Sequence, residues 1–189
     1  MAQLSDDCFA FGGELTPLDE ALAALQDRTV PIAGISTVPL RDAVGRILAV
    51  DIVSSSDVPP HANSAVDGYA VYFDDLSPDS ETRLPVAGRA AAGHPLPQPA
   101  QRGGAVRIFT GAPMPEGVAG IAPDTVMMQE DCRLDGETVV IQPGIKQGAN
   151  RRAAGEDIRT GETVLATGQR LRPQEIGVAA SLGYTALAV

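Results

Sequence analysis

Cysteine is scarce in this chain, which has only Cys8 and Cys132 among 189 residues. The two lie far apart and outside any CxxC spacing, so the sequence indicates neither a disulfide framework nor a zinc site. We expect both to be free thiols in a reducing compartment. The cytoplasm is therefore the predicted location.

Aromatic residues are also few: tryptophan is absent and Phe, Trp and Tyr together make up 4% of the chain. The 44% of apolar residues suffice for a core, which must then be built from Val, Leu, Ile and Ala. With 20 glycines and 15 prolines the chain favours many turns. These proportions predict a folded, soluble, β-rich protein.

Positive charge is in deficit, with a formal net charge of −10. Such a surface repels phosphate backbones, so we expect no nucleic-acid partner. No apolar run reaches the roughly 18 residues of a membrane span, and the N-terminus has acidic residues where a signal peptide needs basic ones. The sequence therefore predicts no membrane association. The common nucleophile, nucleotide and zinc motifs are absent as well, so those mechanisms have no motif support.

Helical patterns stand at both ends of the chain. Residues 16–30 predict a helix with Thr16 as its cap and Pro17 in its first turn. Residues 38–49 predict a second helix by their apolar spacing, followed by a strand near residue 52. A third helix is predicted to begin at Pro173 and to end at Gly183. The last six residues are apolar and strand-like, an ending more typical of a cut within a longer protein.

The middle of the chain has a different texture, with short apolar runs between turn clusters, which indicates a small barrel or sandwich. Asp135-Gly136 in "CRLDGETVVI" predicts a hairpin with a type I′ turn. We predict an α+β fold in which residues 54–150 form a β-barrel-like domain. That domain is inserted into a discontinuous helical domain made of residues 1–53 and 151–189.

Three segments carry candidate chemistry, and each also has a purely structural explanation. Asp67 in "NSAVDGYAV" precedes a glycine, and for an isolated Asp-Gly pair a turn is the more frequent explanation. Thr110 beside Gly111 in "IFTGAPMPEG" can present donors to an anion, or form an ordinary turn. The acidic and basic residues of "RRAAGEDI" fit an anion clamp beside metal-binding carboxylates, or a solvated charge cluster.

Taken together and in this order, these three segments resemble the signatures of the MoeA/gephyrin E-domain family, the molybdopterin molybdenumtransferases. The resemblance extends over nearly the whole chain. It implies an enzyme of molybdenum cofactor biosynthesis that takes adenylylated molybdopterin and molybdate and, with Mg²⁺, releases AMP. It also implies an elongated homodimer of four domains per subunit. Other cofactor-biosynthesis proteins are expected as further partners. The pterin-binding and C-terminal β domains of that family are absent from this chain.

The resemblance also implies a set of site residues. Asp67, Thr110 and Asp157 match residues of the family's active-site cleft. We expect the two carboxylates to hold Mg²⁺ or orient the phosphate, and Thr110 to donate to a phosphate or molybdate oxygen. Asn63, Ser64 and Gly111 are then expected to shape the same wall as cofactor-binding residues. Because the family's cleft lies between two subunits, this chain is expected to be incomplete alone.

Two other functions stay open at this point. The chain is also consistent with a non-catalytic dimerisation or scaffold module, as the gephyrin resemblance allows. A weaker alternative is an acidic hydrolase that uses Asp67 and His61.

Overall fold

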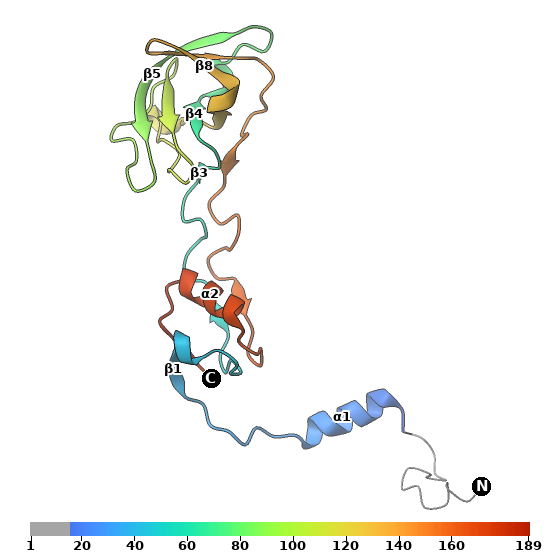
Figure 1. Cartoon of the computed structure of the whole chain (residues 1–189). Coiled ribbons are helices and arrows are strands. Elements are labelled where there is room, and N and C mark those ends of the chain that lie inside the picture. The colour runs from blue at the N-terminus through green and yellow to red at the C-terminus, as the bar shows by residue number, and fades with distance from the viewer. Residues whose placement is uncertain (1–15) are drawn as a thin grey trace, which may run out of the picture. The chain divides into compact units, whose positions relative to one another are not determined.

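The computed structural model describes residues 16–189, which fall by their contacts into one unit that ends at Ser36 and another that spans Thr37–Val189 (Figure 1). Two α-helices lie in this part: α1, Leu18–Arg28, and α2, Pro173–Ser181. The strands are β1 Thr37–Pro39, β2 Ile52–Val53, β3 Asn63–Ser64, β4 Gly68–Val71, β5 Thr82–Ala90, β6 Ala105–Ile108, β7 Thr125–Met128, β8 Cys132–Asp135, β9 Thr138–Ile141, β10 Arg151–Arg152, β11 Thr163–Leu165 and β12 Ala186–Ala188. The remaining elements are short 3₁₀ turns at Leu40–Asp42, Phe73–Asp75, Val118–Gly120 and Gln129–Asp131. Cys8 lies outside the described residues.

The first predicted helix is present as α1, but its cap differs from the prediction. Pro17, not Thr16, is the N-cap residue, and no side chain caps the helix. The predicted apolar face forms, but nothing in its own unit covers it, since no α1 residue is buried and Leu18 and Leu25 are 73% and 62% exposed. We therefore attribute α1 to its own helix propensity and to the acidic residues in its first turn.

The helix predicted over residues 38–49 is wrong. The segment forms β1, one 3₁₀ turn and then an irregular run in which Gly45 has a φ of +81°. A left-handed residue cannot continue an α-helix, and the residues before it are held by pairing with β12, where Val38 lies opposite Leu187. Tertiary strand pairing thus overrides the helical spacing. The strand expected near residue 52 is present as β2, and the terminal strand is present as β12.

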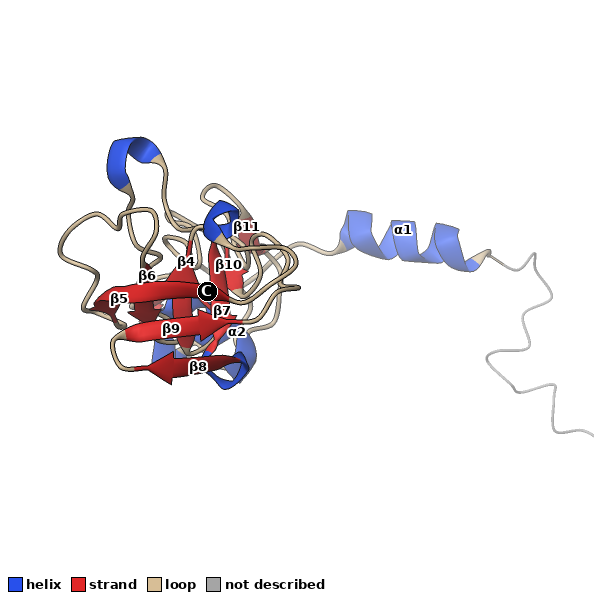
Figure 2. Ribbon diagram, turned by 90° about the horizontal axis from the view of Figure 1, so that it is seen from above, coloured by secondary structure: helices blue, strands red, loops and turns tan. Residues whose placement is uncertain are grey.

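Most of the middle of the chain forms one curled, half-barrel sheet in the order β7-β4-β6-β5-β9-β8. All neighbours are antiparallel except β5 and β6. Figure 2 shows β5, β9 and β8 side by side, as the pairing requires. The sheet carries an apolar cluster on each face, one with Ala70, Val106 and Ile108, the other with Tyr69, Val71 and Met127. The fold is therefore mixed but sheet-dominated.

The predicted hairpin is confirmed, with Asp135 opposite Thr138. Its turn differs from the prediction, because Gly136 occupies the first central position with a φ of +63° and Glu137 follows it without positive φ. A single positive φ at the first central residue is typical of a type II′ turn, whereas type I′ needs two.

A third apolar cluster joins segments from both ends of the second unit. It contains Ala43, Leu48, Ile52, Leu165, Leu171, Ala179 and Leu187, drawn from β2, β11, α2, β12 and the turns beside them. Two short antiparallel pairs, β1 with β12 and β2 with β11, lie in the same segments. The helix predicted after Pro173 is present as α2, and Gly183 follows it with a φ of +86°.

Glu175 of α2 provides a pH-sensitive contact. Its buried carboxylate accepts hydrogen bonds from the Arg172 guanidinium (2.5 Å) and from the Arg172 backbone N–H (2.8 Å). These bonds lower the pKa of Glu175 from 4.5 to about 2. A lowered pKa in the folded state stabilises the fold above about pH 4.5, and that stability is lost as the pH falls towards 2.

We therefore expect Glu175→Gln to lower the thermal unfolding midpoint clearly at pH 6 and only slightly at pH 2. Thermal denaturation followed by circular dichroism across this range measures the difference. Glu137→Gln, in the exposed β8–β9 turn, is the matched control and is expected to shift the midpoint little at either pH. An equal loss for Glu175→Gln at both pH values would contradict the role of the ionised carboxylate.

Candidate functional site

Asp67 and Thr110 are brought together by the ends of two paired strands. Asp67 precedes β4 and Thr110 follows β6, and the antiparallel register sets Gly68 opposite Ile108. Both the backbone N–H and the hydroxyl of Thr110 donate to Oδ1 of Asp67, at 2.8 and 2.7 Å. Two residues 43 positions apart in the sequence therefore form one polar unit at the ends of two inner strands.

These bonds keep the Asp67 carboxylate ionised. Its pKa lies below the usual 3.8 because Thr110 donates first through its backbone N–H and then through its hydroxyl, and the Arg107 charge contributes further. A carboxylate whose pKa is lowered is a weaker proton acceptor than an ordinary aspartate. The arrangement suits holding or orienting a ligand by its negative charge better than transferring a proton.

The Asp67-Gly68 pair is not a turn, contrary to the commoner explanation of such a pair. Gly68 is the first residue of β4, it is buried, and its φ is not positive. A Cβ added there would lie 1.8 Å from the carbonyl oxygen of Met127 in β7. Glycine is required by the close approach of a neighbouring backbone, and the Asp67 side chain is thereby held where β4 begins.

Arg107 was not among the residues identified from the sequence. Its guanidinium donates to the carbonyl of Gly68 at 2.8 Å and to Oε1 of Gln129, and it lies over the rings of Tyr69 (5.2 Å) and Phe109 (4.4 Å). It therefore holds together β4 and β6 where Asp67 and Thr110 leave them. The available signal was an arginine inside the apolar run "AVRIF", which needs internal hydrogen-bond acceptors.

Ser64 and Gly111 are joined by a backbone hydrogen bond next to the Asp67–Thr110 pair. The N–H of Gly111 donates to the carbonyl of Ser64 at 2.8 Å, and Gly111 has a φ of +78°, which favours glycine. The buried Ser64 hydroxyl donates to the carbonyl of Val66 at 2.6 Å and so shapes the turn before Asp67. Both residues hold the Thr110 loop next to the turn before Asp67. That they shape a wall of the cleft and bind cofactor stays a prediction.

Asn63 lies at the junction of two segments. It pairs with Arg152 in β10 and forms an isolated bridge with Pro113 beyond Thr110. Its Oδ1 atom is buried and accepts no hydrogen bond from the described residues. A buried acceptor that receives no hydrogen bond lowers the stability of the fold by about 1–3 kcal/mol. Strand β3 thus links the Thr110 loop to β10.

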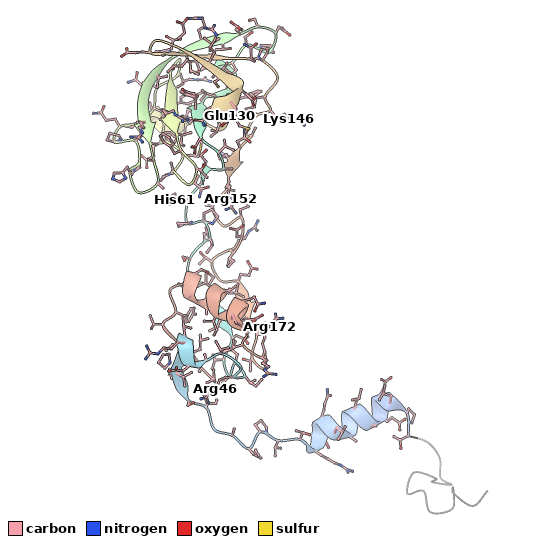
Figure 3. All side chains as sticks on the ribbon, viewed as in Figure 1. Arg46, His61, Glu130, Lys146, Arg152 and Arg172 are labelled. Atoms are coloured by element: carbon pink, nitrogen blue, oxygen red, sulfur yellow. The ribbon has the colours of Figure 1, made fainter. Side chains whose placement is uncertain are left out.

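Asp157 belongs to a separate ion pair. Its carboxylate accepts from the guanidinium of Arg152 at 2.5 Å, and the same guanidinium reaches Glu156 at 3.4 Å. Figure 3 labels Arg152 on β10, which pairs with β3. Among residues 16–189 no hydrogen bond or ion pair joins Asp157 to Asp67 or Thr110. They are linked only indirectly, through β10 and β3.

The geometry of the Asp67–Thr110 pair occurs a second time in the chain. Asp57 accepts from the backbone N–H and the hydroxyl of Thr160, at 2.8 and 2.9 Å, and its pKa is lowered by those same two bonds. An Asp-Thr pair is therefore also a structural device here, and hydrogen bonding alone does not single out Asp67. The turn after the threonine is repeated too, since Gly161 has a φ of +85° and its N–H donates to the carbonyl of Ser54 at 2.8 Å. The contacts of Arg107 with Gly68 and Gln129 distinguish the Asp67 pair.

The expected magnesium site is not complete within this part of the chain. No group of three or more His, Cys, Asp or Glu side chains suited to a metal ion occurs among residues 16–189. Mg²⁺ takes six oxygen ligands, of which proteins commonly supply one or two carboxylates and the substrate or water the rest. That Asp67 and Asp157 each supply a carboxylate to Mg²⁺ therefore stays a prediction.

The hydrolase alternative requires His61 and Asp67 to act together, and the described residues show no hydrogen bond between them. His61 is exposed. The lowered pKa of Asp67 is also the opposite of what a general acid needs.

No helix in residues 16–189 combines the length and the hydropathy needed to cross a bilayer.

Comparison with known proteins matches residues 16–183 to the family described as the MoeA N-terminal region (domain I and II). The chain is 38% identical over 164 residues to a molybdopterin molybdenumtransferase of Synechococcus elongatus, covering 85% of this chain and 39% of that protein. A molybdopterin molybdenumtransferase of Haemophilus influenzae is 41% identical over 145 residues, with 76% and 34% covered.

A solved structure has the same fold. The crystal structure of the molybdopterin biosynthesis MoeA protein from Pyrococcus horikoshii OT3 superposes with a TM-score of 0.81 at 35% identity. The match covers 93% of this chain and 46% of that one, so the chain spans less than half the length of the relatives it matches. Sequence and fold agree, and the chain belongs to the MoeA family, of which it carries the N-terminal region.

Proposed function

We propose that this chain is the N-terminal part of a molybdenum insertase. The complete protein inserts molybdate into adenylylated molybdopterin and releases AMP during molybdenum cofactor biosynthesis. The single observation that supports this most is the family match over residues 16–183, within which Asp67 and Thr110 lie hydrogen-bonded. Because the relatives are more than twice as long, the proposal assigns the chain one wall of the active site.

Each residue has a role in this proposal that follows from its contacts. Asp67 stays ionised at neutral pH and presents a negative charge of fixed orientation. Thr110 fixes that orientation, and its hydroxyl reaches a phosphate or molybdate oxygen only in competition with Asp67. Arg152 orients the Asp157 carboxylate. The position of the Thr110 loop is set by Asn63, Ser64 and Gly111.

Mg²⁺ is part of the proposed reaction, in which it neutralises phosphate charge. In this chain Asp67 and Asp157 each contribute at most a carboxylate, and the other ligands come from the substrate, water or the rest of the protein. In this proposal the two carboxylates also help to hold and orient the substrate.

The wider arrangement is also a proposal. We place residues 1–53 with 151–189 in a discontinuous domain and residues 54–150 in an inserted β domain, in an elongated homodimer in the cytoplasm. Other proteins of cofactor biosynthesis are further partners.

The test is AMP release from adenylylated molybdopterin, molybdate and Mg²⁺. We expect none from residues 1–189 alone, and release from a fusion of this chain to the C-terminal remainder of the Synechococcus elongatus relative. That remainder alone is the control and is expected to be inactive. Circular dichroism establishes that the fusion is folded; a folded fusion without AMP release would contradict the proposal.

A dimerisation or scaffold module is the second candidate, and the Asp57–Thr160 pair, which repeats the geometry of Asp67 and Thr110, favours it. It predicts that Leu18→Ser together with Leu25→Ser abolishes self-association in sedimentation measurements, whereas changes at Asp67 and Thr110 leave every activity of the complete protein intact.

A further inference from the structure

Strand β5 contains a β-bulge, which changes the face of the sheet from which the Arg89 side chain projects. Val86 pairs with Ala105 and Arg89 with Arg107, so three steps along β5 match two along β6. The extra residue reverses the alternation of side chains after Val86. Without it Arg89 would project from the opposite face of the sheet. With it, Arg89 lies beside Arg107 on the face that carries Tyr69.

Placing these two arginines side by side is unfavourable unless something offsets it. Like charges opposite one another on neighbouring strands destabilise a sheet. Among residues 16–189 no carboxylate oxygen lies within ion-pair distance of Arg89 or Arg107, although the chain as a whole carries a net charge of −10. By contrast, Arg83 on the same strand is paired with Asp135 at 2.6 Å.

Phe109 lies against both guanidinium groups, 4.4 Å from that of Arg107 and 4.7 Å from that of Arg89. The two arginines differ in their other contacts. Arg107 donates to the backbone of Gly68 and to Gln129. Arg89 donates no hydrogen bond to a described residue, so the ring orients its charge while its N–H groups stay available.

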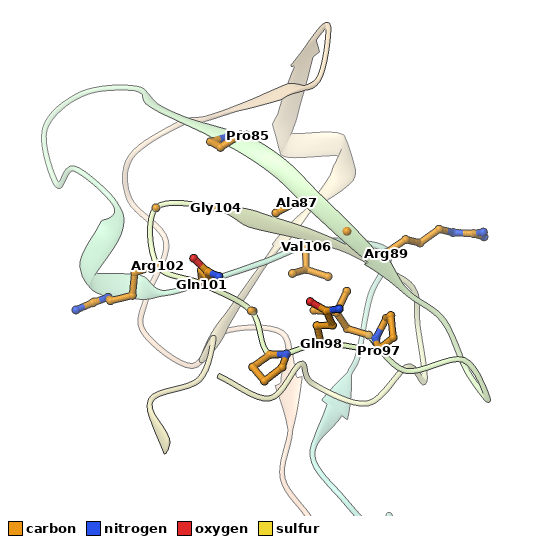
Figure 4. A pocket seen from close by; sticks show the side chains of 14 residues that line it. Pro85, Ala87, Arg89, Pro97, Gln98, Gln101, Arg102, Gly104 and Val106 are labelled. Atoms are coloured by element: carbon orange, nitrogen blue, oxygen red, sulfur yellow. The ribbon is translucent and has the colours of Figure 1, made fainter. Parts of the chain in front are cut away.

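The surroundings of Arg89 are open and lie next to the Thr110 loop. A hollow of about 340 Å³ is lined by Arg89, Ala91 and His94. The N–H of Phe109, the residue before Thr110, donates to the carbonyl of Ala90 at 3.3 Å. Arg89 also lines a larger cavity together with Ala87 and Val106, and Figure 4 shows the end of its side chain extending outward from that cavity.

We propose that Arg89, oriented by Phe109, forms with the hollow at His94 an anion subsite that binds a phosphoryl group of the substrate beside the Asp67–Thr110 pair. The proposal rests on the proposed function for the identity of the substrate. The binding itself requires only a dianionic oxygen group that accepts the N–H donors of Arg89. An arginine that merely covers Phe109 would instead contact no anion.

The test is a titration of the ¹⁵N-labelled chain at low ionic strength with AMP, inorganic phosphate and adenosine. We expect AMP and phosphate to shift the amide signals of Ala90–His94 and Thr110, and adenosine to leave them unchanged. Arg89→Gln is expected to weaken phosphate binding about tenfold. Arg83→Gln, which removes the same charge from the same strand, is expected to weaken it less than about twofold.

Three other outcomes of this titration would overturn the subsite. Equal weakening in both variants would mean that only net charge matters and would overturn the subsite, as would the absence of shifts near Arg89. Shifts with AMP and adenosine but not with phosphate would identify a site for the base and also overturn it. Failure of the subsite leaves the AMP-release test unaffected, because that test does not involve Arg89.

Discussion

Gly68→Ala is expected to lower the free energy of unfolding by about 3 kcal/mol, at the upper end of the range for overpacked cores. The added Cβ would lie 1.8 Å from the Met127 carbonyl oxygen and 2.8 Å from its carbon. Both are backbone atoms of β7, so the clash is relieved only if the paired strands separate. Because Asp67 precedes Gly68 directly, the candidate site would be displaced as well.

Urea denaturation of the chain and its variant measures this loss. Gly177→Ala in α2 is the matched control, because the same methyl group meets no atom within 4 Å there apart from its own helix backbone and chain neighbours. Alanine is favoured over glycine inside a helix, so this variant is expected to gain about 0.5–1 kcal/mol. Unchanged stability of Gly68→Ala would contradict the close approach of β7 to β4.

Asp67→Asn is expected to reduce AMP release by the active fusion at least about 100-fold, as is usual when a charged group in an active site is lost. The amide keeps the shape of the side chain but removes its charge. Asp57→Asn is the matched control, since Asp57 makes the same two hydrogen bonds to Thr160. We expect the control to keep at least about a third of the activity.

The comparison separates catalysis from folding. Thermal unfolding is expected to show similar losses of stability in both variants, because the hydrogen bonds removed are equivalent. A large loss of activity in Asp67→Asn alone then assigns a function to its charge. Equal activities in the two variants would identify both pairs as structural devices and would favour the scaffold module.

The fold was partly predictable from local patterns. The helix near residue 18, the hairpin at Asp135-Gly136 and the helix after Pro173 follow from periodicity and from turn residues, which act over a few positions. The helix expected over residues 38–49 fails because pairing with β12, far away in the sequence, determines that segment. Local spacing carries no information about such a partner.

The candidate site shows the same division. The resemblance identifies Asp67, Thr110 and Asp157, but it does not show that Asp67 contacts Thr110 while Asp157 contacts Arg152. Nor does it indicate Arg107, whose hydrogen-bond acceptors lie on neighbouring strands. These contacts depend on the register of β4 against β6, and register is a property of strand pairing.

The sequence by itself determined the family, the acidic and tryptophan-free composition and the candidate residues, because motifs and composition are read along the chain. Only the tertiary structure decided that Asp67-Gly68 is the start of a strand instead of a turn, and that an equivalent Asp57–Thr160 pair exists. It also decided that a bulge sets Arg89 beside Arg107. The physical reason is that close backbone approach, strand register and shared hydrogen bonds join residues that the sequence keeps far apart.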